Sequence, residues 1–256
     1  MKTPRFALLL GVLVSGLSVD SAASQASDVS YDRILAATEE PENWLTYNGT
    51  YSSQRHSLLD QINPSNVDDL ELKWMLQNQV FGAWQSNPIV VDGIMYVTQR
   101  PNDVMAVDAI TGRVFWRYQW ANSPDATVCC GANNRGVAIL GNKVFMGTLD
   151  AHLVALDATN GQPLWVTEVG DVNLAYSLTM APLAVKDKVI VGVGGGEYGI
   201  RGYIAAYNAD TGEEEWRFYT IPGEGEPHND TWEDDSWKTG GAPTWITGAY
   251  DPELNL

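Results

Sequence analysis

Short apolar runs interrupted by pairs of turn residues recur along the chain. IVVDGIMYVTQ at 89–99, VAILGNKVFMGT at 137–148 and LAVKDKVIVGVG at 183–194 share this pattern. Their midpoints hold Asp-Gly, Gly-Asn and Lys-Asp, and pairs of this kind form the tight turn of a β-hairpin. Each run therefore predicts two antiparallel strands.

A second motif follows each hairpin, in which an Ala-x-Asp or Ala-x-Asn step leads through a Gly to a Trp. The three copies are AVDAITGRVFW at 106–116, ALDATNGQPLW at 155–165 and AYNADTGEEEW at 206–216. Their Trp residues are 49 and 51 residues apart, and Trp74 in LELKW resembles a degenerate copy 42 residues before Trp116. The Asp or Asn and the Gly are typical of a turn, and the Trp on the next strand can pack on the neighbouring repeat.

A repeating unit of about 50 residues with about four strands is typical of a propeller blade. The sequence therefore predicts an all-β fold, a β-propeller with Trp-motif blades, of which about four fit in this chain. These blades form either a complete ring or part of a larger one. The alternative is a stack of β-hairpins in a sandwich, and the fixed period with its repeated Trp favours the propeller.

Composition and charge narrow the range of partners. The chain has 10 Trp, 24 Gly and a net charge of −17. Such an acidic protein is not expected to bind nucleic acid, because phosphate contacts need a basic surface. The charge is compatible with a cationic protein partner, or simply with a soluble surface.

Residues 1–26 are typical of a secretory signal peptide. Lys2 and Arg5 precede an apolar stretch of 14 residues from Phe6 to Val19, and small residues follow. That stretch is too short to span a bilayer as a mature helix, and no later segment is a candidate, so we expect no stable membrane span. We expect a periplasmic protein whose mature part is 27–256.

Cys129 and Cys130 are the only cysteines, and they are adjacent. In an exported protein such a pair usually forms a disulfide, the alternative being free or intermolecularly paired thiols. A zinc site is not supported, because there is neither a second Cys pair nor a spaced His pair. The chain also has no Cys-x-x-Cys-His motif for haem attachment.

The segments around these motifs resemble the N-terminal half of the quinoprotein methanol and ethanol dehydrogenases. The similarity rests on VCCGANNRGVA at 128–138, on GGGEYGIRGYIAAYNADTGEEEWRFYTIPG at 194–223 and on DSWKTGGAPTWITGAYDPELNL at 235–256, and it extends from Trp44 to Leu256. The resemblance implies an eight-bladed propeller about twice this length, so the chain is expected to be a truncated or partial form. It also implies pyrroloquinoline quinone (PQQ) beside a calcium ion, or a lanthanide, as cofactors.

The resemblance assigns cofactor-binding roles to residues spread along the chain. The disulfide ring of Cys129 and Cys130 would lie against one face of PQQ and Trp245 against the other. Arg135 would pair with the oxygens of PQQ, because a guanidinium matches carboxylates well. Thr179 would hydrogen-bond a PQQ carboxylate.

Further positions match the family less completely. Glu197 falls at the family's metal-ligating glutamate, and hard cations prefer carboxylate oxygens. Gly194, Gly195 and Gly196 would let the backbone approach a flat ligand, although the family often has Ser at the first position, so only backbone contacts are expected there. Gln85 falls where many members have Glu. Pro243 replaces a family Thr, which puts a hydroxyl contact there in doubt, although Thr244 is adjacent.

The activity that the resemblance implies is oxidation of a primary alcohol to an aldehyde, with electrons passed to a periplasmic cytochrome c. The catalytic base, a metal-ligating Asn and a second cofactor Arg are expected beyond Leu256. The acidic run from Glu233 to Asp235 is interpreted as a solvated loop. The alternatives are a non-catalytic scaffold of the outer-membrane assembly type, a sugar or polymer dehydrogenase of the same superfamily, and an inactive truncated product.

Overall fold

A computed structural model describes residues 28–78 and 80–256, and the expected signal peptide at 1–26 lies outside this part. The described chain forms three four-stranded antiparallel sheets, each with its strands in sequence order. The first contains β1 (Ile89–Val91), β2 (Ile94–Gln99), β3 (Asp103–Asp108) and β4 (Val114–Gln119). The second contains β5 (Ala138–Leu140), β6 (Lys143–Gly147), β7 (His152–Asp157) and β8 (Pro163–Glu168). The third contains β9 (Leu183–Val185), β10 (Lys188–Gly192), β11 (Tyr203–Asn208) and β12 (Glu214–Tyr219).

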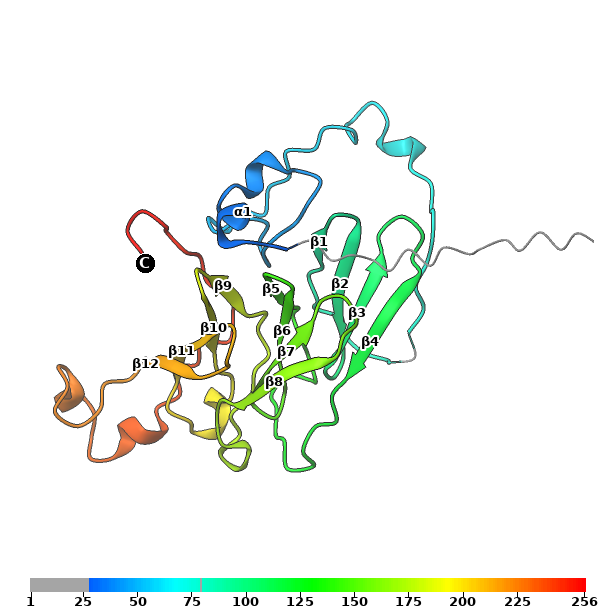
Figure 1. The fold of residues 1–256 in the computed structure, drawn as a ribbon. Coiled ribbons are helices and arrows are strands. Elements are labelled where there is room, and N and C mark those ends of the chain that lie inside the picture. The colour runs from blue at the N-terminus through cyan, green and yellow to red at the C-terminus, as the bar shows by residue number, and fades with distance from the viewer. Residues whose placement is uncertain (1–27, 79) are drawn as a thin grey trace, which may run out of the picture.

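Helices are short and lie outside the sheets. They are α1 (Tyr31–Leu35) and the 3₁₀ turns η1 (Ala37–Glu39), η2 (Val67–Asp69), η3 (Val172–Leu174), η4 (Gly196–Tyr198), η5 (Asn229–Thr231) and η6 (Ser236–Thr239). Figure 1 shows the three sheets side by side like the blades of an incomplete propeller, with the segment before β1 looping around one end. The predicted all-β propeller is confirmed, and three of its blades are complete within the described residues.

The repeated Trp residues occupy equivalent positions in the three blades, as predicted. Trp116, Trp165 and Trp216 lie on the fourth strand of their sheets, opposite Ala106, Ala155 and Ala206 respectively, and the strand register shifts directly after each of these alanines. The same register irregularity at the same place in each blade shows that the repeat in sequence is a repeat in structure.

The first and second blades are each joined to the following blade by their Trp. The indole Nε1 of Trp116 donates a hydrogen bond of 2.9 Å to the backbone carbonyl of Ala158 in the next blade, and that of Trp165 donates one of 3.2 Å to Ala209. Trp74 Nε1 likewise donates a hydrogen bond of 3.1 Å to the backbone carbonyl of Ala109. Trp74 thus occupies the docking position of a Trp motif, although its own segment forms no sheet with the described residues.

A glycine lies directly beneath each docked indole. A Cβ atom at Gly161 would come within 2.4 Å of Trp116, and one at Gly212 within 2.6 Å of Trp165. Both glycines also have a positive φ, +73° and +74°, which side-chain-bearing residues rarely adopt. The Gly of the repeat is therefore needed both for the turn and for the close approach of the Trp ring.

Candidate functional site

Four loops at one edge of the second and third blades meet around a cavity of about 150 Å³. They are the disulfide loop between β4 and β5, the segment before β9, the glycine segment after β10 and the segment around Trp245. Eight of the ten residues that the sequence predicts for the site line this cavity: Cys129, Cys130, Arg135, Thr179, Gly194, Gly195, Glu197 and Trp245. The fold therefore brings together residues that are far apart in sequence.

The loop that carries the cysteines is held from both sides. Cys129 and Cys130 form the expected disulfide, and Cys130 has a left-handed φ of +66°. The side-chain amide of Asn133 donates a 2.9 Å hydrogen bond to the carbonyl of Cys130, and Arg100 Nε donates one of 3.1 Å to the carbonyl of Ala132. These contacts fix the disulfide ring at the wall of the cavity.

The start of the same loop is anchored by a buried carboxylate, Asp150. It accepts hydrogen bonds from Thr148 Oγ1 at 2.6 Å, Trp120 Nε1 at 2.9 Å and the backbone N–H of Ser123 at 2.8 Å. His152 Nδ1 lies 3.5 Å away. Burial acts to raise the pKa of Asp150, but these hydrogen bonds outweigh it, so the pKa lies below its ordinary value.

Arg135 is a half-buried cation without an acidic partner among the described residues. Its Nη1 donates a 3.0 Å hydrogen bond to the carbonyl of Thr179, and its Cζ lies 4.8 Å from the ring centroid of Trp245. Burial lowers the pKa of Arg135, but a guanidinium stays charged in proteins. A desolvated guanidinium that keeps free donors is suited to bind an anion.

Glu197 presents the complementary charge. It lies in η4, it is exposed, and its carboxylate makes no hydrogen bond or ion pair with any described residue. A carboxylate oxygen of Glu197 lies within 4.8 Å of the sulfur atoms of Cys129 and Cys130. Sulfur ligands bind metals as thiolates, so in the disulfide form only Glu197 of this group offers a metal ligand. Calcium takes about six to eight oxygens, most of which must come from elsewhere.

The three glycines before Glu197 let its segment approach neighbouring chains. A Cβ at Gly195 would lie 2.2 Å from the carbonyl oxygen of Ala175, and Gly195 has a φ of +112°. A Cβ at Gly196 would lie 2.7 Å from Pro243 Cδ. Gly196 thus packs against Pro243 and, unlike the two glycines before it, does not line the cavity.

The structure also places Gln85 outside the group of residues that line the cavity. Gln85 is exposed and does not line the cavity formed by the described residues, so its proposed contact with the cofactor stays a prediction. Thr244 is committed elsewhere, because its Oγ1 donates a 2.6 Å hydrogen bond to the carbonyl of Tyr203. Pro243, which replaces a Thr of the family, lines the cavity.

Four lining residues are missing from the sequence-based prediction: Gly131, Asn133, Ser177 and Pro243. For Ser177 a signal exists, because it precedes Thr179 by two positions in an extended segment. Alternate residues of an extended chain point to the same side. No comparable signal marks Asn133, whose place depends on the path of the disulfide loop.

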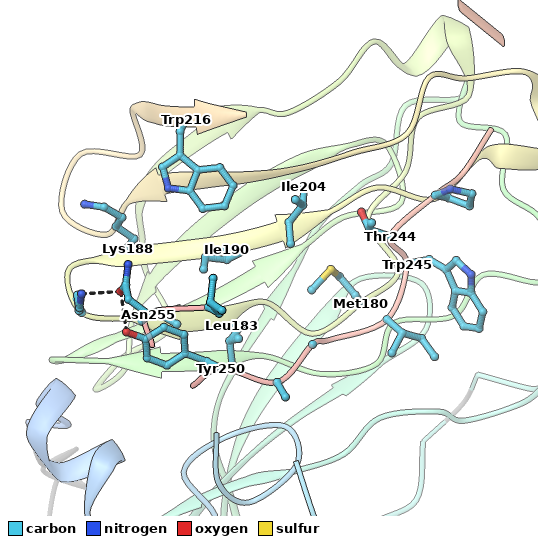
Figure 2. A pocket seen from close by; sticks show the side chains of 17 residues that line it. Met180, Leu183, Lys188, Ile190, Ile204, Trp216, Thr244, Trp245, Tyr250 and Asn255 are labelled. Carbon is cyan, nitrogen blue, oxygen red and sulfur yellow. Dashed lines mark hydrogen bonds between the residues drawn. The ribbon is translucent and has the colours of Figure 1, made fainter. Parts of the chain in front are cut away.

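A larger groove of about 740 Å³ lies on the open face of the third blade. Figure 2 shows its apolar lining, with Leu183, Ile190, Ile204 and Trp216 along the sheet and Trp245 at one end. In the first and second blades the corresponding Trp is covered by the following blade, whereas Trp216 is 41 % exposed. We therefore interpret the groove as a blade-packing face and the smaller, polar cavity as the functional site.

Comparison with known proteins agrees with this fold. A family model described as the β-propeller domain of PQQ-dependent glucose, ethanol and alcohol dehydrogenases matches residues 44–256. The chain is 43 % identical to the quinohemoprotein alcohol dehydrogenase ADH IIB of Pseudomonas putida over 100 % of its own length and 38 % of the relative's. It is 37 % identical to the lanthanide-dependent methanol dehydrogenase of Methylacidiphilum fumariolicum, over 88 % of this chain and 41 % of that protein.

Solved structures give the same result. The structure of the quinohemoprotein alcohol dehydrogenase ADHIIG from Pseudomonas putida HK5 superposes with a TM-score of 0.81 at 40 % identity, covering 90 % of this chain and 36 % of that one. The fold and site define a quinoprotein-type propeller. The chain belongs to the PQQ-dependent glucose, ethanol and alcohol dehydrogenase family, and it spans about two fifths of the length of the curated relatives it matches.

Within residues 28–78 and 80–256, no helix combines the length and the apolar character needed to cross a membrane.

Proposed function

We propose that this chain is the N-terminal part of an exported quinoprotein alcohol dehydrogenase. In the whole protein it would bind PQQ together with calcium or a lanthanide and oxidise a primary alcohol to the aldehyde. Electrons would then pass to a periplasmic cytochrome c. The single observation that carries the proposal is the arrangement of two oppositely charged residues in one cavity, next to an adjacent-cysteine disulfide. Within the part of the chain that the structure describes, the arginine has no acidic partner and the glutamate has no cationic one.

The residues of the cavity fit such a cofactor by their chemistry. Arg135 offers guanidinium donors for carboxylate oxygens, and Glu197 offers an oxygen ligand for the cation. Cys129–Cys130 and Trp245 offer broad surfaces for a flat ring system. When bound, the quinone accepts the two electrons of the alcohol, and the cation polarises it as a Lewis acid.

The described residues supply only part of this site. The cavity of about 150 Å³ is smaller than the roughly 300–1,000 Å³ of typical ligand pockets, so further walls are needed. Glu197 is its only lining carboxylate among the described residues and is assigned to the cation. The exposed run from Glu233 to Asp235 does not line the cavity, which supports its interpretation as a solvated loop. We propose that the catalytic base lies outside the described residues.

The test is PQQ binding, measured by equilibrium dialysis with calcium present. Arg135→Leu should weaken binding at least tenfold, because it leaves the bound carboxylate unpaired. Arg113→Leu is the matched control, since Arg113 Cζ lies 4.9 Å from the ring of Phe115 in a similar arrangement remote from the cavity. Equal affinities of the two variants would contradict the proposed site. The scaffold alternative is not favoured, because the relatives are alcohol dehydrogenases.

A further inference from the structure

Ser177 carries a hydroxyl group that the fold almost buries and leaves without a partner. The residue is 3 % exposed and lines the cavity. Its Oγ forms no hydrogen bond with any of the described residues, in contrast to Thr148 and Thr244, whose hydroxyls donate to Asp150 and to the carbonyl of Tyr203. The Oγ atom itself is not fully enclosed, so it opens onto the cavity and is placed to donate a hydrogen bond to a ligand there.

The space in front of this hydroxyl is created by a glycine on the neighbouring chain segment. Ser177 and Gly194 form an antiparallel bridge, in which Gly194 N–H donates to the carbonyl of Ser177 at 2.8 Å. A Cβ on Gly194 would lie 2.9 Å from Ser177 Oγ and 3.8 Å from Thr179 Oγ1. Any side chain at position 194 would therefore displace the Ser177 hydroxyl, and the glycine keeps the space open.

The charge next to this space indicates what kind of group would fill it. Arg135 is hydrogen-bonded to the carbonyl of Thr179, two residues from Ser177, and it has no acidic partner among the described residues. Residues 177 and 179 lie on the same side of an extended segment. A neutral hydroxyl donor beside an unpaired guanidinium is a typical arrangement for binding a carboxylate or another oxyanion.

We propose that Ser177 Oγ donates a hydrogen bond to a carboxylate oxygen of the ligand held by Arg135, and that Gly194 is required because it leaves room for this contact. The inference rests on the proposed function for the identity of the ligand, PQQ. It makes Ser177 a binding residue and replaces the expectation that only backbone contacts are available around Gly194.

Four variants test this contact: Ser177→Ala, Gly194→Ala, the exchange Ser177→Gly/Gly194→Ser, and Ser65→Ala. The last is a control on an exposed serine that does not line the cavity. Dialysis against PQQ with calcium should give an affinity about tenfold weaker for Ser177→Ala, as expected for losing a hydrogen bond to a charged group, and unchanged for Ser65→Ala. The exchange variant returns the hydroxyl from the opposite segment and should recover most of the affinity.

Thermal unfolding without ligand provides a second measurement. Ser177→Ala should not lower the melting temperature, because its hydroxyl has no protein partner to lose. Gly194→Ala should lower it, and Ser177→Ala/Gly194→Ala should recover part of the loss, because the 2.9 Å conflict is removed. A lower melting temperature for Ser177→Ala would show a structural role instead.

The outcomes separate the two proposals. If Arg135→Leu binds PQQ no more weakly than the control Arg113→Leu, the proposed function fails, and the assignment of Ser177 fails with it. If the chain binds PQQ and Arg135→Leu weakens binding while Ser177→Ala does not, the proposed function stands and the role of Ser177 is overturned.

Discussion

Replacing Gly161 with alanine should destabilise the protein far more than the same change at Gly93. Both glycines have left-handed backbones, with φ of +73° and +79°, so both variants carry the cost of about 1–2 kcal/mol for an L-residue in that region. A Cβ at Gly93 meets nothing within 4 Å, whereas one at Gly161 would lie 2.4 Å from Trp116 Cε3. The indole must then move, which adds about 1–3 kcal/mol for overpacking.

Moving the indole also weakens the 2.9 Å hydrogen bond from Trp116 to Ala158, for a further loss of about 0.5–1.5 kcal/mol. The expected destabilisation is therefore about 2.5–6.5 kcal/mol at Gly161 against about 1–2 kcal/mol at Gly93. Urea unfolding followed by tryptophan fluorescence measures both, and Gly225, with a φ of +83° and nothing within 4 Å, is a second control. Equal losses at the three sites would refute the argument that the Trp motif joins the blades by close packing on this glycine.

Four further predictions follow from the site and its supports. Thiol titration of the unfolded, unreduced protein should find no free thiol from Cys129 and Cys130, and two titratable thiols would contradict the disulfide. Glu197→Gln should lower the calcium affinity measured by calorimetric titration, because a charged ligand is lost. The control Glu233→Gln changes an exposed glutamate and should leave the calcium affinity unchanged. An unchanged affinity of the Glu197→Gln variant would remove Glu197 from the metal site. Asp150 has a lowered pKa in the folded protein, so its contribution to stability is present above its unfolded pKa of about 3.9 and is lost as pH falls through the folded value. Asp150→Asn should therefore flatten the pH dependence of urea unfolding below about pH 4. An unaltered pH profile would rule out this linkage. Finally, the chain alone, supplied with PQQ and calcium, should not reduce a dye with ethanol or methanol. The reason is that the described residues line the cavity with no carboxylate besides Glu197, and general base catalysis contributes about 10²–10⁴-fold. Turnover of about 1–10³ per second would show that a base lies within the chain.

The features that depend on local pattern can be predicted from the sequence. The hairpin turns, the Asp-x-x-x-Gly turn and the spacing of Trp116, Trp165 and Trp216 are each written within one repeat, because strand alternation and turn geometry depend on near neighbours. A repeat must also pack on its neighbour to bury its apolar face, so the propeller follows from the period. The adjacency of Cys129 and Cys130 likewise predicted the disulfide.

Which distant residues meet depends on how the blades and loops pack together. Ser177 faces Gly194 because a bridge joins their segments in one register, and Asn133 lines the cavity because the disulfide loop folds back on itself. Gln85 does not line the cavity that the described residues form, and its contact with the cofactor stays a prediction of the resemblance. These outcomes depend on the paths of loops and on the register between segments, and neither has a periodic signature along the chain. The repeat pattern therefore predicts the scaffold, whereas the contacts that complete the binding site arise only when the blades and their loops are assembled.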